Sequence, residues 1–180
     1  MTQLATFAGG CFWCIEAALA QVRGVTAVVS GYMGGSSATA NYRAVCTGTT
    51  GHAEVVQLHY DPALISYELL LQMFFQLHDP TTLNRQGNDV GTQYRSEIFV
   101  HDEAQLQAAQ QCIQQLQADT AVPVVTAISR ASTFYPAEPY HQDYYNQNPQ
   151  QSYCAYLIAP KLAAFSRQFS EQLQTKNPVC

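Results

Sequence analysis

A short run near the start of the chain, GGCFWC at residues 9–14, contains two cysteines in a setting that favours reactivity. A strand is expected before its two glycines, which allow a tight turn, and a helix after them. Cys11 then falls at the beginning of the helix, where free backbone amides and the positive end of the helix dipole lower the pKa of a thiol. We therefore predict that Cys11 is a nucleophilic thiolate. The alternative is a buried structural cysteine.

Phe12 and Trp13 follow the first cysteine. Exposing the only tryptophan of the chain beside a reactive thiol is costly unless the two rings form the wall of a binding site. Such a wall suits a small apolar group, for example a methyl group on sulfur. The alternative is that both rings are ordinary members of the core. The aromatic pair thus predicts an apolar substrate-binding site next to Cys11.

Cys11 and Cys14 also form a Cys-x-x-Cys pair, which is typical of two other kinds of site. One is a general thiol–disulfide oxidoreductase, and the other is half of a zinc site. No second pair of cysteines and no spaced histidine pair completes a zinc site in the sequence, so no metal is expected. A further alternative, without catalysis, is a module that binds a thioether in an aromatic cage while its cysteines stay inert.

The composition is that of an ordinary globular protein with few charges. Of its 180 residues, 47% are hydrophobic and 12% are charged, and the formal net charge is -5. The eight lysines and arginines are scattered singly, which argues against binding to nucleic acid or to a membrane surface. The N-terminus lacks a signal-peptide pattern, and no apolar run reaches the ~18 residues of a membrane span. We expect a cytoplasmic monomer whose six cysteines are free, metal-bound or catalytic rather than structural disulfides, because that compartment is reducing.

Hydrophobic periodicity and turn signals divide the chain into strands and helices. Ser66 is the expected N-cap of the second helix. Irregular structure is expected at residues 79–91 and 134–145. Strands are expected at residues 3–8, 25–33, 53–60, 93–100 and 122–129, and helices at residues 12–22, 66–78, 102–118 and 160–173.

The order of these elements predicts the fold class. The succession β-α-β-β-α-β-α-β favours an α/β (α+β) protein in which helices pack against a mixed β-sheet. We expect a ferredoxin-like core of two layers, followed by a long irregular C-terminal segment. No linker or repeat divides the chain, so residues 1–180 are expected to form a single domain, with residues 166–180 as its tail. The glutamine-rich residues 105–117 are expected to form a solvated helix face.

Several blocks of the sequence, in order, resemble the A-type peptide methionine sulfoxide reductases, which act on the S epimer of the sulfoxide. The resemblance covers about residues 4–165, and agreement in several separate blocks is far more specific than a lone Cys-x-x-Cys pair. The blocks are GGCFWCIEA (9–17), SGYMGG (30–35), YRAVCTGTTGHAEVV (42–56), HDPTTLNRQGNDVGTQYRS (78–96), FYPAEPYHQDYY (134–145) and NPQQSYC (148–154).

The resemblance implies roles that agree with the chemistry of a sulfoxide. The oxygen leaves only after protonation, and the family's acid falls on Glu54, whose pKa would be raised by surrounding aromatic rings. Hydrogen-bond donors to that oxygen fall on Tyr42 and Tyr94. Asp89 takes the family's second acidic position and would order water or the substrate amide. Tyr153 would complete the aromatic rim of the substrate site.

A reaction cycle is implied as well. The Cys11 thiolate attacks the sulfoxide sulfur while Glu54 protonates the oxygen, methionine leaves, and Cys11 becomes a sulfenic acid. A second thiol condenses with it to a disulfide, which thioredoxin or a similar external dithiol reduces. The expected enzyme is a thioredoxin-dependent peptide-methionine (S)-S-oxide reductase that repairs oxidised methionine, free or in proteins. No metal or organic cofactor is expected.

The identity of the second thiol is open between several cysteines. Cys154 is favoured, because the family often places its resolving cysteine there and an irregular tail could swing over the site. Cys14 is the alternative, although a rigid helix would hold it too far from Cys11 for an unstrained disulfide unless the first turn unwinds. The remaining possibilities are Cys46 as the resolving cysteine and direct reduction of the sulfenic acid by the external dithiol. The stretch after Cys154, AYLIAPKLAAF, replaces the glycine-rich segment that carries a further cysteine in some members, so a relay of three cysteines is not expected.

Four further residues are expected to have no chemical role. Cys112 falls in the pattern of a long helix and Cys180 is the last residue of the chain. His52 and His141 lie in matching blocks, but each is expected to be a structural histidine rather than a general base.

Overall fold

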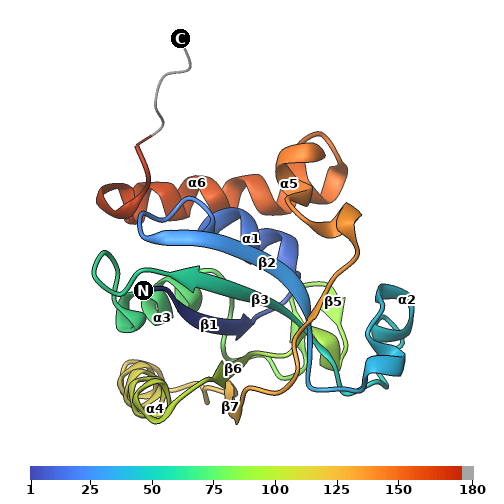
Figure 1. The fold of residues 1–180 in the computed structure, drawn as a ribbon, viewed down its shortest axis with the longest axis horizontal. Helices are drawn as coiled ribbons and strands as arrows, with labels where there is room; N and C mark the ends of the chain where they lie inside the picture. Colours follow the sequence, from blue (N-terminus) through green and yellow to red (C-terminus); the bar gives the residue numbers. More distant parts are fainter. Residues whose placement is uncertain (176–180) are drawn as a thin grey trace.

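The computed structural model describes residues 1–175, and its largest feature is a six-stranded sheet with the strand order β7-β6-β1-β3-β2-β8 (Figure 1). Neighbouring strands are antiparallel except for β6 and β7, so the sheet is mixed, as predicted. The strands are β1 (Gln3–Ala8), β2 (Val25–Met33), β3 (Ala53–Tyr60), β6 (Glu97–Val100), β7 (Ala127–Arg130) and β8 (Tyr135–Pro136).

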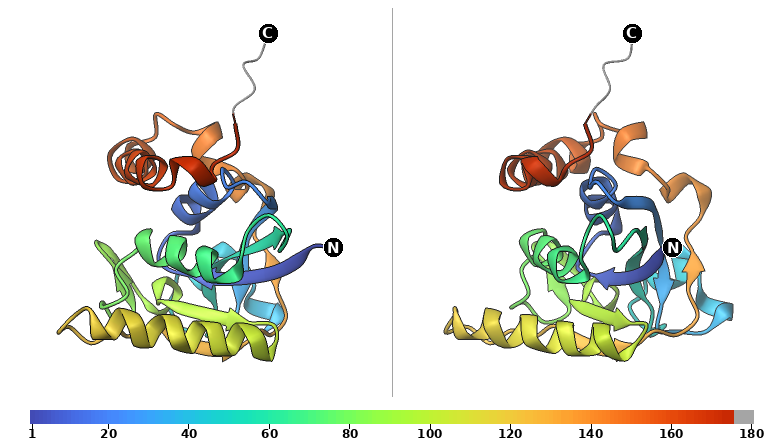
Figure 2. Two further views of the ribbon diagram at one scale, coloured as in Figure 1. Left: turned by 90° about the vertical axis from the view of Figure 1, so that its left-hand side faces the viewer. Right: turned by 60° about the vertical axis from the view of Figure 1, so that its left-hand side comes forward.

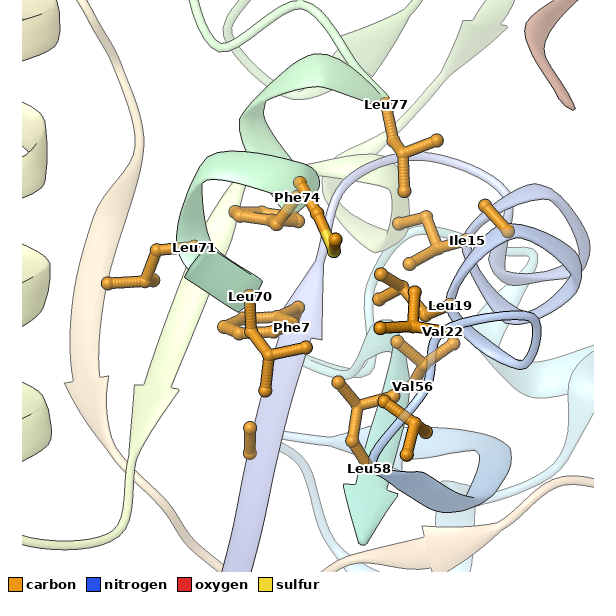
Figure 3. Packing of buried hydrophobic residues seen from close by; sticks show 14 of the residues in the cluster. Phe7, Ile15, Leu19, Val22, Val56, Leu58, Leu70, Leu71, Phe74 and Leu77 are labelled. Atoms are coloured by element: carbon orange, nitrogen blue, oxygen red, sulfur yellow. The ribbon is translucent and has the colours of Figure 1, made fainter. Parts of the chain in front are cut away.

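Four of these strands and two helices make the ferredoxin-like core that was expected. Along the chain, β1 is followed by α1 (Phe12–Leu19), β2, β3, α3 (Tyr67–Gln76) and β6. In space the four strands lie in the order β6-β1-β3-β2. Side chains of both helices point toward Phe7, Val56 and Leu58 on one face of the sheet, which gives the two layers (Figure 3).

The packing between these layers fixes the turn that carries Cys11. The ring of Phe7 at the end of β1 stacks on Phe74 of α3 with the centroids 4.8 Å apart. Ile15 and Leu19 of α1 are fully buried in the same cluster. Burial of each such side chain stabilises the fold by about 1.5–3 kcal/mol, so both elements that flank the turn are held firmly.

Two helices begin at the caps that their sequences indicate. Ser66 Oγ accepts a hydrogen bond from the Leu69 amide (3.1 Å) at the start of α3. The Asp102 carboxylate accepts one from the Gln105 amide (2.8 Å) at the start of α4 (Glu103–Ala118). The glutamines of α4 face solvent as expected, except for Gln105, which is buried and donates to the Leu4 carbonyl (2.7 Å).

Two strands are shorter than predicted. Residues 92–94 form a 3-10 helix, η2 (Thr92–Tyr94), and β6 begins only at Glu97. Arg95 holds this bend because its guanidinium donates to the carbonyls of Thr92 (3.0 Å) and Gly51 (2.9 Å). β7 begins at Ala127, after Pro123, which has no amide proton for a sheet. Elements that were not expected are η1 (Ser37–Thr39), α2 (Tyr42–Val45), β8, and a hairpin of β4 (Arg85–Gln86) and β5 (Asp89–Val90).

The C-terminal part is more helical than predicted. After η3 (Pro139–His141) and α5 (Tyr144–Gln147), the π-helix η4 (Cys154–Ile158) leads directly into α6 (Ala159–Gln168), which is followed by η5 (Ser170–Gln172). The apolar residues at 154, 158, 162, 165 and 169 recur at helical spacing and are all buried.

Because these apolar residues are buried, α6 packs over α1 (Figures 1 and 2). The expectation of an irregular tail around Cys154 is wrong, and the helix expected at residues 160–173 starts earlier. Cys180 lies outside the described residues. Within residues 1–175, no helix is long and apolar enough to cross a membrane.

Candidate active site

Cys11 is the N-cap residue of α1, as the sequence predicts. Its backbone is extended (φ -63°, ψ 125°), and its carbonyl accepts a hydrogen bond from the Cys14 amide (3.3 Å). Gly10 before it has φ +85°, and a Cβ there would lie 2.7 Å from Cγ of Gln86. Only glycine fits this turn without strain, and the turn directs the half-buried Cys11 side chain into a pocket.

That pocket has a volume of about 130 Å³ and brings together segments from the whole chain. Both acidic residues, both tyrosines expected near the oxygen, and the aromatic rim lie around the Cys11 side chain. The lining residues are Cys11, Phe12, Trp13, Tyr42, Glu54, Asp89, Tyr94 and Tyr153. Every predicted site residue except the two candidate resolving cysteines thus lines one cavity.

Glu54 lies on β3, is 2% exposed, and reaches the start of α1. One carboxyl oxygen accepts a hydrogen bond from the Phe12 amide (3.3 Å). Burial is the main cause that raises the pKa of Glu54 to about 8, and the nearby Asp89 adds to the shift, although the Phe12 amide opposes it. The expectation of a raised pKa is confirmed, and Glu54 is a neutral acid over most of the range below pH 8.

The predicted low pKa of Cys11 is wrong. Burial, and then the Glu54 carboxylate, raise the pKa of the Cys11 thiol well above its ordinary value, and the hydrogen bond from the Trp13 amide opposes them only in part. One backbone amide at a helix N-terminus is therefore outweighed by desolvation and by a buried carboxylate. Without substrate, Cys11 holds its proton near neutral pH.

Tyr42 and Tyr94 face the pocket from two short helices. Tyr42 is the first residue of α2, and its amide donates to Glu138 Oε2 (3.2 Å). Tyr94 ends η2, next to Arg95. Burial and the Glu54 carboxylate contribute to raising the pKa of both phenols, with Cys46 also acting on Tyr42. Both hydroxyls therefore stay protonated and available as hydrogen-bond donors.

A hydrogen bond between Tyr153 and Asp89 connects two segments that line the pocket. The Tyr153 hydroxyl donates to Asp89 Oδ2 (2.6 Å), which links the start of the C-terminal helix to the β4–β5 hairpin. Burial, followed by the negative charge of Cys11 in its thiolate form, raises the pKa of Tyr153. The hydroxyl remains a donor, and the pair forms one wall beside the Cys11 sulfur.

The indole of Trp13 is fixed from three sides. Tyr144 of α5 stacks on it with the centroids 3.7 Å apart and the planes 8° from parallel, and Tyr153 meets it edge-on at 6.0 Å. The indole nitrogen donates to Nδ1 of His141 (3.1 Å). Burial lowers the pKa of His141, so the ring is neutral and carries its proton on Nε2, 3.9 Å from Glu138. His141 is structural, as expected, but its bond to Trp13 was not foreseen.

Glu16 contributes to the site although no role for it was expected from the sequence. It lies on the buried side of α1, where it accepts hydrogen bonds from Ser30 Oγ (3.1 Å) and from the Asp143 amide (2.9 Å). Asp143 has φ +53°, a left-handed conformation that non-glycine residues rarely adopt, and Tyr144 follows it directly. A glutamate on the apolar face of α1 was the available signal. Glu16 thereby sets the place of the ring that stacks on Trp13.

The remaining cysteines differ in accessibility. Cys154 is fully buried and is the first residue of η4, directly after Tyr153. Cys14 is 6% exposed and lines a second cavity together with Cys11. Cys46 is exposed at the end of α2, and Cys112 is half-buried on α4. These thiols are free.

The described residues hold no cluster of metal ligands, and His52 makes contacts between two loops. No group of three or more His, Cys, Asp or Glu residues among residues 1–175 is arranged to hold a metal ion. The ring of His52 accepts a hydrogen bond from the Gly35 amide (3.1 Å), and its other nitrogen lies 2.8 Å from the Ser36 carbonyl. This ring holds two loops together, as expected of a structural histidine.

Comparisons with known proteins agree on one family. A family model described as "Peptide methionine sulfoxide reductase" matches residues 3–174, beyond the expected range at both ends. A relative from Chromobacterium violaceum, named peptide methionine sulfoxide reductase MsrA, is 57% identical over 172 residues, covering 94% of this chain and 98% of the relative. Reduced Mxr1 from Saccharomyces cerevisiae has a similar crystal structure, with a TM-score of 0.81 and 37% identity over 85% of this chain and 89% of Mxr1. Mxr1 in a complex with Trx2 matches with a TM-score of 0.57 and 28% identity over 79% of this chain and 84% of Mxr1.

Proposed function

The chain belongs to the peptide methionine sulfoxide reductase family, and on this premise we propose how its residues carry out the reaction. The activity is that of an oxidoreductase that returns methionine sulfoxide to methionine and so repairs oxidative damage. We propose that the S epimer is the substrate, free or within proteins. The observation that carries the mechanism is that a thiol, Cys11, and a neutral carboxylic acid, Glu54, line one small aromatic pocket.

The substrate sulfur is placed between these two groups. Its methyl group packs against Phe12 and Trp13, which offer an apolar surface next to the Cys11 sulfur. The sulfoxide oxygen accepts hydrogen bonds from the Tyr42 and Tyr94 hydroxyls, both of which retain their protons. Donors held in place before the reaction stabilise the charge that develops on this oxygen.

The first step transfers the oxygen to the enzyme. The Cys11 sulfur bonds to the substrate sulfur while the Glu54 proton moves to the substrate oxygen. The resulting hydroxyl group then moves to the Cys11 sulfur. The substrate S–O bond and the bond between the two sulfurs break, a bond from the oxygen to the Cys11 sulfur forms, and methionine departs and leaves Cys11 as a sulfenic acid. The substrate sulfur gains two electrons and the Cys11 sulfur loses two.

The protonation state of the resting site shapes this step. Both Cys11 and Glu54 have raised pKa values, so the resting site holds a proton on each. Loss of one proton from this pair gives two forms that compete with each other. One is a Cys11 thiolate beside protonated Glu54, which is the reactive form, and the other is a Cys11 thiol beside a Glu54 carboxylate. We propose that the bound sulfoxide favours the reactive form, because its polar oxygen accepts a hydrogen bond from the acid and leaves the thiolate as nucleophile.

A second cysteine then removes the oxygen. We propose Cys154 as the resolving cysteine, with Cys14 as the alternative. Attack of the second thiol on the sulfenic acid forms a disulfide and releases water. Support for Cys154 comes from its position directly after Tyr153, whose ring lines the same pocket as Cys11. Its location in a π-helix also supports the proposal, because such turns are often found at functional sites.

An external dithiol completes the cycle. The complex of Mxr1 with Trx2 supports a thioredoxin as the reductant, which would exchange its thiols with the enzyme disulfide. We further propose that the enzyme works as a monomer in the cytoplasm without a cofactor, since that compartment keeps thioredoxin reduced.

An epimer-resolved assay tests the function. With dithiothreitol, the enzyme should reduce blocked methionine S-sulfoxide and leave the R epimer, and Cys11→Ser should abolish the reaction. Turnover confined to the R epimer would contradict the proposal.

A pair of serine variants tests the resolving cysteine. Cys154→Ser should still release methionine in a single turnover but should lose thioredoxin-dependent turnover, while Cys14→Ser should keep both. Mass-spectrometric mapping after one turnover should find Cys11 joined to Cys154. The reverse pattern would assign the role to Cys14.

A further inference from the structure

A second cavity lies directly against the catalytic pocket. Its volume is about 200 Å³, and Cys11, Asp89 and Tyr153 line both cavities. The two cavities therefore adjoin each other at Cys11 and at the hydrogen-bonded pair of Tyr153 and Asp89. The proposed reduction of the sulfoxide takes place in the pocket that contains Glu54 and Trp13, so the second cavity has no role in that step.

The walls of this cavity suit a peptide chain. Gly9 and Gly87 contribute backbone without side chains, and Leu77 and Leu157 contribute apolar surface. Leu157 is 46% exposed and is therefore accessible to a ligand. Asp89 uses Oδ2 to accept from Tyr153, which leaves Oδ1 at the boundary of the two cavities as an acceptor for an amide. A backbone that emerges from the catalytic pocket would meet these groups first.

Lys161 is the only basic residue in the lining of either cavity. It lies on α6, its side chain is exposed, and it has no ion-pair partner among residues 1–175. Its charge is felt at two buried groups, because it lowers the pKa of both Cys14 and His78. In a chain with a net charge of -5, an unpaired cation beside the active site provides charge complementarity for an anion.

The cavity continues away from Cys11 as a groove. Leu77, Gln86 and Lys161 also line a third cavity of about 360 Å³, between the end of α3 and α6. Lys161 follows Tyr153 by eight positions, which corresponds to at most about 12 Å along a helix. An extended peptide covers that distance in about three or four residues, and long side chains shorten it further.

We propose that this groove binds the substrate polypeptide on one side of the oxidised methionine, and that Lys161 selects an acidic side chain about two to four residues away. The inference rests on the proposed function and extends it from the sulfoxide to the surrounding sequence. The ligand is thus an acidic segment of an oxidised protein. Other charged groups near the groove are Asp89 and Asp79, which would disfavour acidic residues placed elsewhere along it.

Single-turnover kinetics with short peptides test the proposal. Each peptide carries one methionine S-sulfoxide and a Glu, Gln or Lys placed one to four residues away on either side. Reduced enzyme without any reductant is used, so that thioredoxin docking does not contribute. Blocked methionine S-sulfoxide, which has no flanking residues, serves as the reference substrate.

At the preferred position, the second-order rate constant of the wild type should be about two- to fivefold higher for Glu than for Gln, the range expected of an exposed ion pair. The preference should shrink in high salt. Lys161→Gln should remove it and Lys161→Glu should reverse it in favour of Lys. Arg167→Gln, a charge change on the same helix at a residue that lines neither of these cavities, should keep it.

Two outcomes would overturn the proposal: equal wild-type rates for Glu, Gln and Lys at every position, or a Glu preference that survives Lys161→Gln. All variants should reduce the blocked reference substrate at the wild-type rate. Failure of the wild-type enzyme on that reference would instead count against the proposed function, so the two failures are distinguishable.

Discussion

Replacing Glu54 by glutamine should have opposite effects on the two reactions of Cys11. The amide oxygen of glutamine still accepts the hydrogen bond that the Phe12 amide gives to Oε1 (3.3 Å), so the start of α1 should keep its geometry. Glutamine has no acidic proton, however, and carries no charge at any pH. Reduction of the sulfoxide should therefore collapse, while simple alkylation of Cys11 should become faster at alkaline pH.

The size of the loss follows from the buried carboxyl. With a pKa of about 8, Glu54 is protonated in about 90% of molecules at pH 7, whereas a carboxyl with the ordinary value of 4.5 would be protonated in about 0.3%. Burial thus raises the fraction of Glu54 that is protonated at pH 7 roughly 300-fold. A positioned general acid contributes about 10²- to 10⁴-fold to a rate, and we expect Glu54→Gln to lose an amount within this range.

The gain in alkylation follows from charge. The Glu54 carboxylate is the second cause of the raised pKa of Cys11, after burial. Removing it should lower the pKa of Cys11 and speed reaction with iodoacetamide by up to roughly tenfold per pKa unit recovered. The difference should be large at pH 9, where wild-type Glu54 is ionised, and small at pH 6, where it is neutral.

The assay measures methionine release in a single turnover over a range of pH. The wild-type rate should rise as the pair of Cys11 and Glu54 loses its first proton and fall as it loses the second. The variant should show only the rising limb, since one titrating group remains. Glu103→Gln, at an exposed position of α4, is the matched control and should behave as the wild type.

Methionine release within about a factor of two of the wild type would refute the role of Glu54 as the acid. Alkylation at pH 9 that does not change would refute the electrostatic coupling of the two groups. One set of pKa values for Cys11 and Glu54 must explain both methionine release and alkylation, because the same carboxyl affects both reactions.

The contacts around the site lead to three more predictions. Folding keeps Glu54 protonated above its ordinary pKa, so the folded chain binds a proton that the unfolded chain loses, and stability falls as pH rises from 4.5 to about 8. In urea titrations, Glu54→Gln should therefore raise the free energy of unfolding by up to about 3 kcal/mol at pH 7 and by almost nothing at pH 4. Glu16→Leu leaves the Asp143 amide without its acceptor, so it should cost about 1–3 kcal/mol of stability and raise KM for blocked methionine sulfoxide. Glu16→Gln should restore most of the stability and of the KM. An unchanged KM in the leucine variant would contradict the positioning role of Glu16. Tyr153→Phe removes the hydrogen bond to Asp89 and should weaken substrate binding by roughly fivefold, the equivalent of about 1 kcal/mol, while leaving the alkylation rate of Cys11 at pH 6 unchanged.

The sequence by itself determined the parts of this protein that depend on local pattern. The strands β1, β2 and β3 have the predicted bounds, because alternation and turn residues mark their ends within a few positions. Ser66 caps α3 as its residue type indicates. The residues that line the pocket around Cys11, Glu54 and Tyr94 were marked by the resemblance of their sequence blocks to a known family, since the residue type of Glu54 alone indicates only an exposed carboxylate on a strand.

Contacts between distant segments decided the rest. Helical spacing from Cys154 onward could have predicted the longer C-terminal helix, but not that Tyr153 bonds to Asp89. The buried bond from Glu16 to the Asp143 amide joins positions 127 residues apart and has no local signature.

Local sequence also predicted the wrong sign for the pKa of Cys11, because the helix N-terminus is visible in the sequence whereas desolvation is not. The proton affinity of a buried group is set by everything that packs around it, and only the folded chain brings those atoms together.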